Sequence, residues 1–447
     1  SGPQWKNQHV FLRALMSYHL GRSEEAEPAL RSLLGGVVPA DGLYARAGWL
    51  LGRIYLSHEA PQPALSFFDD VLSKTVPGPY YGQALLGRAE ALAELERHEE
   101  SVEAFERLIR EVLERPYDWQ VDLQVVRQTT TALSERLRTA GRPAEAMAYL
   151  RIGARLAPPG DVGLAAIYAE RQGDLALALG RFWAERALRS GRASEGDSAR
   201  SSFVEAAESY LRLAKLRMTD EPASASATWK AADALDLAGE RGRRAEVLAA
   251  FVRERPDNPR VPEALLRLGQ TYQVLGEGDR AIAAYQRNLT EYPRTYWAVQ
   301  CLVPLAACFV EADEAVKAEE TLLRIVDRQP GEPVALIRPE AREYQDALFA
   351  LGDLYIRTGQ YERAIGRFEE ALSRYPEDGR ADRAAFLVAD AYRRSAAQIR
   401  EDLKDPQKVA YKDDLKYRHQ ERLKRAEALF SEVIERYRNR PADSLGE

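Results

Sequence analysis

Prolines recur at a fixed interval along the second half of the chain. Pro256, Pro293 and Pro330 follow one another at intervals of 37 residues, and Pro376 follows after 46. Each of them ends a stretch of helical pattern, because proline cannot continue a helix. An interval of this length is typical of repeat architectures, in which each unit buries the apolar face of its neighbour. The spacing therefore predicts a stacked helical array whose core grows along one axis.

The two intervals that end at Pro293 and Pro376 contain the same residue types in the same order. Leucine and tyrosine at helical spacing form the apolar stripe of a first helix. Small residues beside the leucine and on a second helix let the two backbones approach to roughly 8–10 Å. A glycine between the helices permits the turn with positive φ that closes the pair. These residues are Leu268-Gly269, Tyr272, Gly276, Ala281 and Tyr285 in one interval, and Leu351-Gly352, Tyr355, Gly359, Ala364 and Phe368 in the other.

This pattern resembles the tetratricopeptide repeat. The resemblance implies an all-α fold, a right-handed α-solenoid of stacked antiparallel helix hairpins, and a function in binding other proteins. Weaker units continue the frame toward the N-terminus, and the clearest of them runs from Leu51-Gly52 to Pro77. The register over residues 161–256 stays open.

Composition and charge exclude several function classes. A formal net charge of −6 gives no global basic field, so we expect no nucleic-acid partner. The five histidines are scattered, and none begins an H-E-x-x-H zinc motif. We therefore expect a protein that is not an enzyme and that uses no cofactor or metal. Cys301 and Cys308 are too far apart on one predicted helix for a disulfide, so we expect buried thiols.

Breaks in the repeat pattern suggest how the chain is divided. Serine, glycine and charged residues gather near residue 195, which predicts a flexible joint over 191–202. The joint would separate an N-terminal half-array, 1–190, from a C-terminal array, 203–447. The C-terminal array is expected to end in a long helical hairpin over about 380–438 that projects from the stack.

The resemblance also implies where a partner would bind, because the first helix of each tetratricopeptide hairpin lines the concave side. We expect a groove that takes an apolar helix or peptide of a partner protein. The alternative is that Phe349 and its equivalents pack between adjacent first helices. Family members that bind acidic peptide tails use cationic pairs, and this sequence lacks them at the equivalent positions. The groove positions are Trp49, Leu266, Val303, Phe349 and Phe386, followed one turn later by Arg53, Gln270, Ala307, Asp353 and Asp390.

A lysine-rich stretch lies in the predicted terminal hairpin. Lys408, Lys412 and Lys416 share one helical face, where they form a possible patch for acidic protein, anionic lipid or nucleic acid. Asp413 and Asp414 partly neutralise this patch. A solvated face is therefore the favoured interpretation.

The turns around Tyr292-Pro293 and Tyr375-Pro376 look like those of bacterial envelope repeat proteins, such as outer-membrane-assembly lipoproteins and Tol-Pal accessory proteins. That resemblance implies a periplasmic or envelope-associated scaffold, with a cytoplasmic location as the alternative. Ser1-Gly2 resembles a tag-cleavage scar, so membrane contact is expected only through an anchor removed upstream. The favoured function is a non-catalytic scaffold in a multiprotein complex. The alternative is a self-assembling structural component that makes its contacts through the terminal hairpin.

Overall fold

Apolar residues at helical spacing fold the chain into helices joined by short turns, and the described residues contain no strand. The computed structural model describes residues 3–39, 42–114, 120–327, 337–405 and 412–438. The predicted all-α solenoid of antiparallel hairpins is confirmed. Its helices divide into two compact units, Ser1–Glu240 and Arg241–Glu447.

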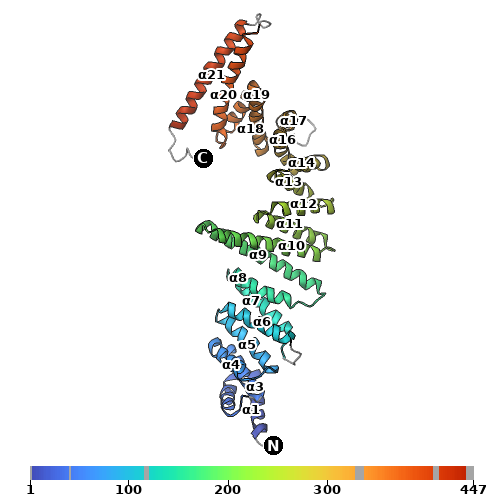
Figure 1. The fold of residues 1–447 in the computed structure, drawn as a ribbon, viewed down its shortest axis with the longest axis vertical. Helices are drawn as coiled ribbons and strands as arrows, with labels where there is room; N and C mark the ends of the chain where they lie inside the picture. The colour runs from blue at the N-terminus through green and yellow to red at the C-terminus, as the bar shows by residue number, and fades with distance from the viewer. Residues whose placement is uncertain (1–2, 40–41, 115–119, 328–336, 406–411, 439–447) are drawn as a thin grey trace. The chain divides into compact units, whose positions relative to one another are not determined.

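In the first unit, successive hairpins pack in chain order (Figure 1). Each first helix contacts its own second helix, and each second helix contacts the next hairpin. The helices are α1 (Pro3–His19), α2 (Ser23–Gly36), α3 (Gly42–Ser57), α4 (Pro61–Lys74), α5 (Pro79–Glu94), α6 (His98–Glu114), α7 (Leu123–Thr139), α8 (Pro143–Arg155), α9 (Val162–Ser190), α10 (Ala193–Leu216) and α11 (Glu221–Leu237).

The second unit repeats the arrangement with one interruption. A short helix precedes the first helix of its second hairpin, and the last hairpin is the longest of this unit, with helices of 22 and 27 residues. The helices are α12 (Arg241–Glu254), α13 (Val261–Val274), α14 (Gly278–Glu291), α15 (Tyr296–Gln300), α16 (Leu302–Glu311), α17 (Ala315–Val326), α18 (Arg342–Arg357), α19 (Tyr361–Arg374), α20 (Ala381–Asp402) and α21 (Lys412–Arg438).

Glycines on first helices receive aromatic rings from second helices. A Cβ atom built on Gly352 would overlap the ring of Phe368, and one built on Gly269 would overlap Tyr285. Both rings are almost fully buried. In each pair, the ring therefore occupies the space that a side chain on the glycine would fill. This is how these small residues permit the close approach of the two helices predicted from the sequence.

Residues 191–192 connect α9 to α10 and residues 193–202 begin α10, where the sequence predicted a flexible joint over 191–202. Helix α10 begins at Ala193. The buried Glu195 carboxylate accepts hydrogen bonds from Arg186, at 2.8 Å, and from Ser190. The polar side chains that suggested a flexible joint thus form hydrogen bonds that close the hairpin of α9 and α10. The two units divide instead between Glu240 and Arg241, which differs from the predicted halves.

Candidate functional site

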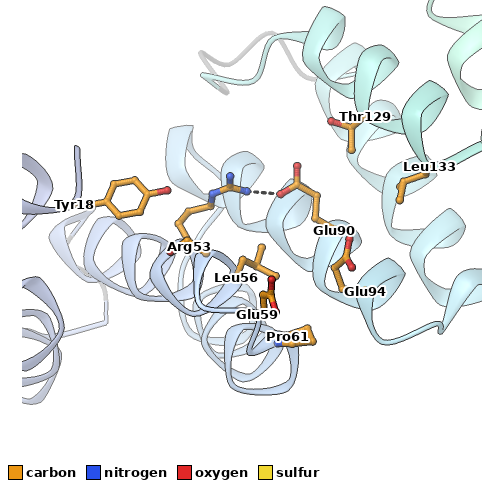
Figure 2. A pocket seen from close by; sticks show the side chains of 10 residues that line it. Tyr18, Arg53, Leu56, Glu59, Pro61, Glu90, Glu94, Thr129 and Leu133 are labelled. Carbon is orange, nitrogen blue, oxygen red and sulfur yellow. Dashed lines mark hydrogen bonds and ion pairs between the residues drawn. The ribbon is translucent and has the colours of Figure 1, made fainter. Parts of the chain in front are cut away.

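The first unit contains an open pocket of about 570 Å³ on the side lined by its first helices (Figure 2). Four hairpins contribute, because the first helices α1, α3, α5 and α7 each supply at least one side chain. The lining residues are Tyr18 on α1; Arg53, Leu56 and Ser57 on α3; Glu59 in the turn after α3; Pro61 at the start of α4; Glu90 and Glu94 on α5; and Thr129 and Leu133 on α7.

Arg53 and Glu90 form an ion pair across the pocket and join the hairpins of α3 and α5. Figure 2 shows the Arg53 guanidinium extending toward Glu90, with Tyr18 on the other side. Burial lowers the pKa of Arg53, but the charge of Glu90 and the Tyr18 hydroxyl outweigh burial and raise it above its ordinary value. Arg53 therefore stays charged and is already paired before any ligand arrives.

Two further carboxylates lie beside this pair. Glu94 is about half exposed and pairs with Arg136 of α7 at 2.8 Å. Glu59 is exposed at the turn between α3 and α4, where its φ is +55°. Within the described parts of the chain, no ion pair within 4 Å involves Glu59. Among the described residues, the carboxylate of Glu59 thus has no cationic partner.

The rest of the lining combines the apolar side chains of Leu56, Pro61 and Leu133 with residues that carry a hydroxyl group, namely Tyr18, Ser57 and Thr129. Leu133 is almost buried, whereas Leu56 and Pro61 are half-buried. Leu56 and Pro61 lie on the same wall of the pocket as Glu59 (Figure 2). A ligand would therefore meet apolar surface and carboxylates side by side.

Of the two groove positions predicted in the first unit, Arg53 lines the pocket. Trp49 does not: it packs on the N-terminal core and stacks edge-on against Tyr80, with the ring centres 5.4 Å apart. Its indole Nε1 is buried and has no hydrogen-bond partner among the described residues.

In the second unit, several predicted groove residues lie in the core. Leu266 and Phe349 are buried, and the guanidinium of Arg380 lies 4.2 Å from the centre of the Phe349 ring. Neither side chain therefore offers much exposed surface to a partner. Asp390 is also buried, and it pairs with Arg393 on its own helix at 2.6 Å.

The other predicted groove positions in the second unit are partly accessible to solvent. Gln270 is exposed and Val303 is half-buried. Asp353 pairs with Arg383 at 3.2 Å, and burial raises the pKa of Asp353 above its ordinary value. Phe386 is 48% exposed and contacts the ring of Phe430 on α21.

The lysine-rich face is only partly described. Lys408 lies outside the described residues. Lys412 and Lys416 are exposed on the first turns of α21, and Lys416 pairs with Asp413 at 3.2 Å. This local neutralisation agrees with the solvated-face interpretation.

Sequence reasoning missed most of the pocket residues. Glu90 stands 37 residues after Arg53, and Glu94 follows one helical turn later. Carrying the repeat interval forward from Arg53 would have found both. Tyr18, Thr129 and Leu133 come from hairpins with degenerate patterns, so no comparable signal marked them.

Other chemistry-bearing groups belong to the core. Burial raises the pKa of Cys301 to about 12 and that of Cys308 to about 11, and both are the buried thiols that the sequence predicted. His98 is buried against Tyr149, and burial lowers the pKa of its imidazole.

Across the described residues, no three His, Cys, Asp or Glu side chains gather in an arrangement for holding a metal ion. No helix in the same residues has the length and apolar character needed to cross a bilayer.

Comparison with known proteins identifies the repeat. Two family models, both described as tetratricopeptide repeat, match the chain: one matches residues 345–378, and the other matches residues 83–112 and 263–295. No curated protein sequence matches the chain. The predicted tetratricopeptide repeats are therefore confirmed in three segments, of which the first includes Glu90 and Glu94.

Solved structures with similar folds include two crystal structures of MamA and a human IFIT1 dimer with PPP-AAAA. The two MamA chains are 20% identical, with TM-scores of 0.32. The matches cover 45% and 46% of this chain and 92% and 96% of those chains. The IFIT1 chain is 15% identical with a TM-score of 0.35, and the match covers 94% of this chain and 88% of that one.

Proposed function

We propose that this chain, which carries tetratricopeptide repeats, is a non-catalytic scaffold that binds a segment of a partner protein in the pocket of its first unit. The observation that supports the proposal is the pocket around the Arg53–Glu90 pair, where four first helices supply apolar and charged side chains to one open space. Repeat arrays present extended surfaces of this kind to partners.

The size of the pocket indicates the kind of ligand. About 570 Å³ is within the range of sites that enclose a small ligand or a few side chains, and it is open to solvent on one side. A helix or extended segment lying along the first helices would place one or two anchor side chains inside it. Such anchors carry most of the binding free energy in peptide recognition.

The test uses peptides selected for binding to the full chain from a random display library. Thr129 is half-buried in the pocket lining, so Thr129→Trp should fill the pocket and weaken selected peptides by about tenfold or more. Gln128→Trp places the same bulk on the same helix at an exposed position outside the lining and should change little. Peptides that bind both variants as tightly as the original chain would refute the pocket as the site.

A second candidate function is self-assembly through the terminal hairpin of α20 and α21. It is favoured by apolar side chains that this hairpin leaves exposed, namely Phe386 at 48%, Leu423 at 43% and Ile434 at 58%. Light scattering over a concentration series tests it. A constant monomer mass would refute it, whereas a mass that rises with concentration and falls for Ile434→Lys would support it. The envelope location suggested by the Pro-containing turns stays a prediction.

A further inference from the structure

The pocket in the first unit has an excess of negative charge. Among its described lining residues, the carboxylates of Glu59, Glu90 and Glu94 accompany the single guanidinium of Arg53. Arg53 is already paired with Glu90. An approaching ligand therefore meets the charges of Glu59 and Glu94, of which only Glu94 has a cationic neighbour, Arg136, in the described structure.

These two carboxylates border the apolar wall. Figure 2 places Glu94 and Glu59 on either side of the space next to Leu56 and Pro61. An acidic peptide tail would bring like charges together at this place, which is unfavourable. A wholly apolar segment would take water from the carboxylates without replacing its hydrogen bonds, which costs free energy. A cation flanked by apolar groups avoids both costs.

Resting on the proposed function, we propose that the pocket selects a partner segment that presents a lysine or arginine next to an apolar side chain. The cation would lie between Glu59 and Glu94, and the apolar side chain would lie on Leu56 and Pro61. The complementarity in charge and in apolar surface at this one pocket supports this occupant.

The backbone at Glu59 makes a clean test possible. Glu59 has a positive φ at a hairpin turn where Gly21, Gly141 and Gly276 stand in other hairpins. A left-handed conformation is unfavourable for a side chain other than glycine. Glu59→Gly therefore removes the carboxylate and relieves backbone strain together, so it should leave the melting temperature unchanged or raise it. A loss of binding without a lower melting temperature would then not arise from unfolding.

Asp313 provides the matched control. It holds the same kind of conformation, with φ of +60°, at the turn between α16 and α17 in the other unit. Asp313→Gly also exchanges an acidic residue for glycine at a left-handed turn, and it leaves the pocket untouched. It should have the same small effect on melting temperature and no effect on peptide binding.

Peptides selected from the random display library against the full chain are the probe. The enriched sequences should contain lysine or arginine beside leucine, isoleucine, valine or phenylalanine. Their affinity should fall about three- to fivefold for Glu59→Gly and for Glu59→Gln, and about tenfold when Glu94→Gln is added. Higher salt should weaken binding to the original chain more than binding to the double variant.

The outcomes separate this inference from the proposed function. Enriched peptides that lack a cation, or that bind Glu59→Gly as tightly as the original chain, while Thr129→Trp abolishes their binding, would overturn the cation preference and leave the pocket as the binding site. Cationic peptides that ignore Thr129→Trp would refute both. Equal losses for Asp313→Gly and Glu59→Gly would also overturn the inference.

Discussion

The hydroxyl of Tyr292 donates a 3.1 Å hydrogen bond to the backbone carbonyl oxygen of Pro256, 36 residues earlier in the chain. Tyr375 makes the same contact with the carbonyl oxygen of Pro339, again 36 residues earlier. Each bond joins the turn after one hairpin to the turn before it. The tyrosine that precedes proline in these turns thus helps to fix the spacing between successive hairpins.

Tyr292→Phe removes this bond while keeping the ring. We expect a loss of about 0.5–1.5 kcal/mol in the free energy of unfolding, because one partly exposed hydrogen bond contributes about that much. Urea unfolding followed by circular dichroism measures it. The control is Tyr296→Phe, because Tyr296 is 63% exposed and its contact with Glu343 is long, at 3.4 Å. Equal losses in the two variants would contradict the assigned role of Tyr292.

The ring of Phe368 occupies the space that a side chain at Gly352 would need. Gly352→Ala should therefore destabilise the second unit by about 1–3 kcal/mol, because overpacking forces the ring or the helix to move. Thermal and urea unfolding measure the loss. Circular dichroism in the absence of denaturant should show that the helices still form.

Substitution of Gly366, in the same hairpin as Gly352, should increase stability. It lies on α19, and a Cβ atom there would meet no atom within 4 Å. Gly366→Ala should stabilise by about 0.5–1 kcal/mol, because alanine restricts the unfolded chain and favours helix. A loss of stability at Gly366 as large as that at Gly352 would show that helix contact does not explain the effect.

The fold was predictable because its main packing contacts form between residues close together in the sequence. Gly269 with Tyr285, and Gly352 with Phe368, lie 16 residues apart in sequence and pack within one hairpin. The residues that pack together within one hairpin can therefore be recognised in one short stretch of sequence. The pattern failed near Glu195, where a polar segment folds into a hairpin through side-chain contacts that composition does not show.

The candidate site was less predictable, because it depends on contacts between hairpins. Arg53 was found by extending the repeat frame, but its partner Glu90 lies in a weaker unit, and only the fold brings the two together. Phe349 occupies a position equivalent to the inner face, yet Arg380 from the next turn covers its ring. Side-chain coverage of this kind depends on long residues in neighbouring turns, which helical periodicity does not specify.

The two cysteines should be unreactive while the chain is folded. Because burial raises the pKa of Cys301 to about 12 and that of Cys308 to about 11, almost no thiolate exists at pH 8. Ellman's reagent should therefore react with neither thiol in the folded chain within minutes and with both after unfolding in guanidinium chloride. Rapid reaction of even one thiol in the folded chain would show that the α14–α16 region opens locally.

The turn closed by Glu195 predicts a specific dependence of stability on pH. Its hydrogen bond from Ser190, followed by contact with Arg186, holds the pKa of Glu195 below its ordinary value of 4.5. A carboxyl group whose pKa is lowered on folding stabilises the folded state above its unfolded pKa, and this contribution disappears as the pH falls through the folded pKa. The difference in unfolding free energy between the original chain and Glu195→Gln should thus be constant from pH 7 to about pH 5 and shrink below that. Ser190→Ala raises the folded pKa toward the unfolded value, so it should make this decrease smaller and leave its onset, which the unfolded pKa sets, unchanged. A difference independent of pH down to about pH 3 would show that Glu195 stabilises the turn by packing alone.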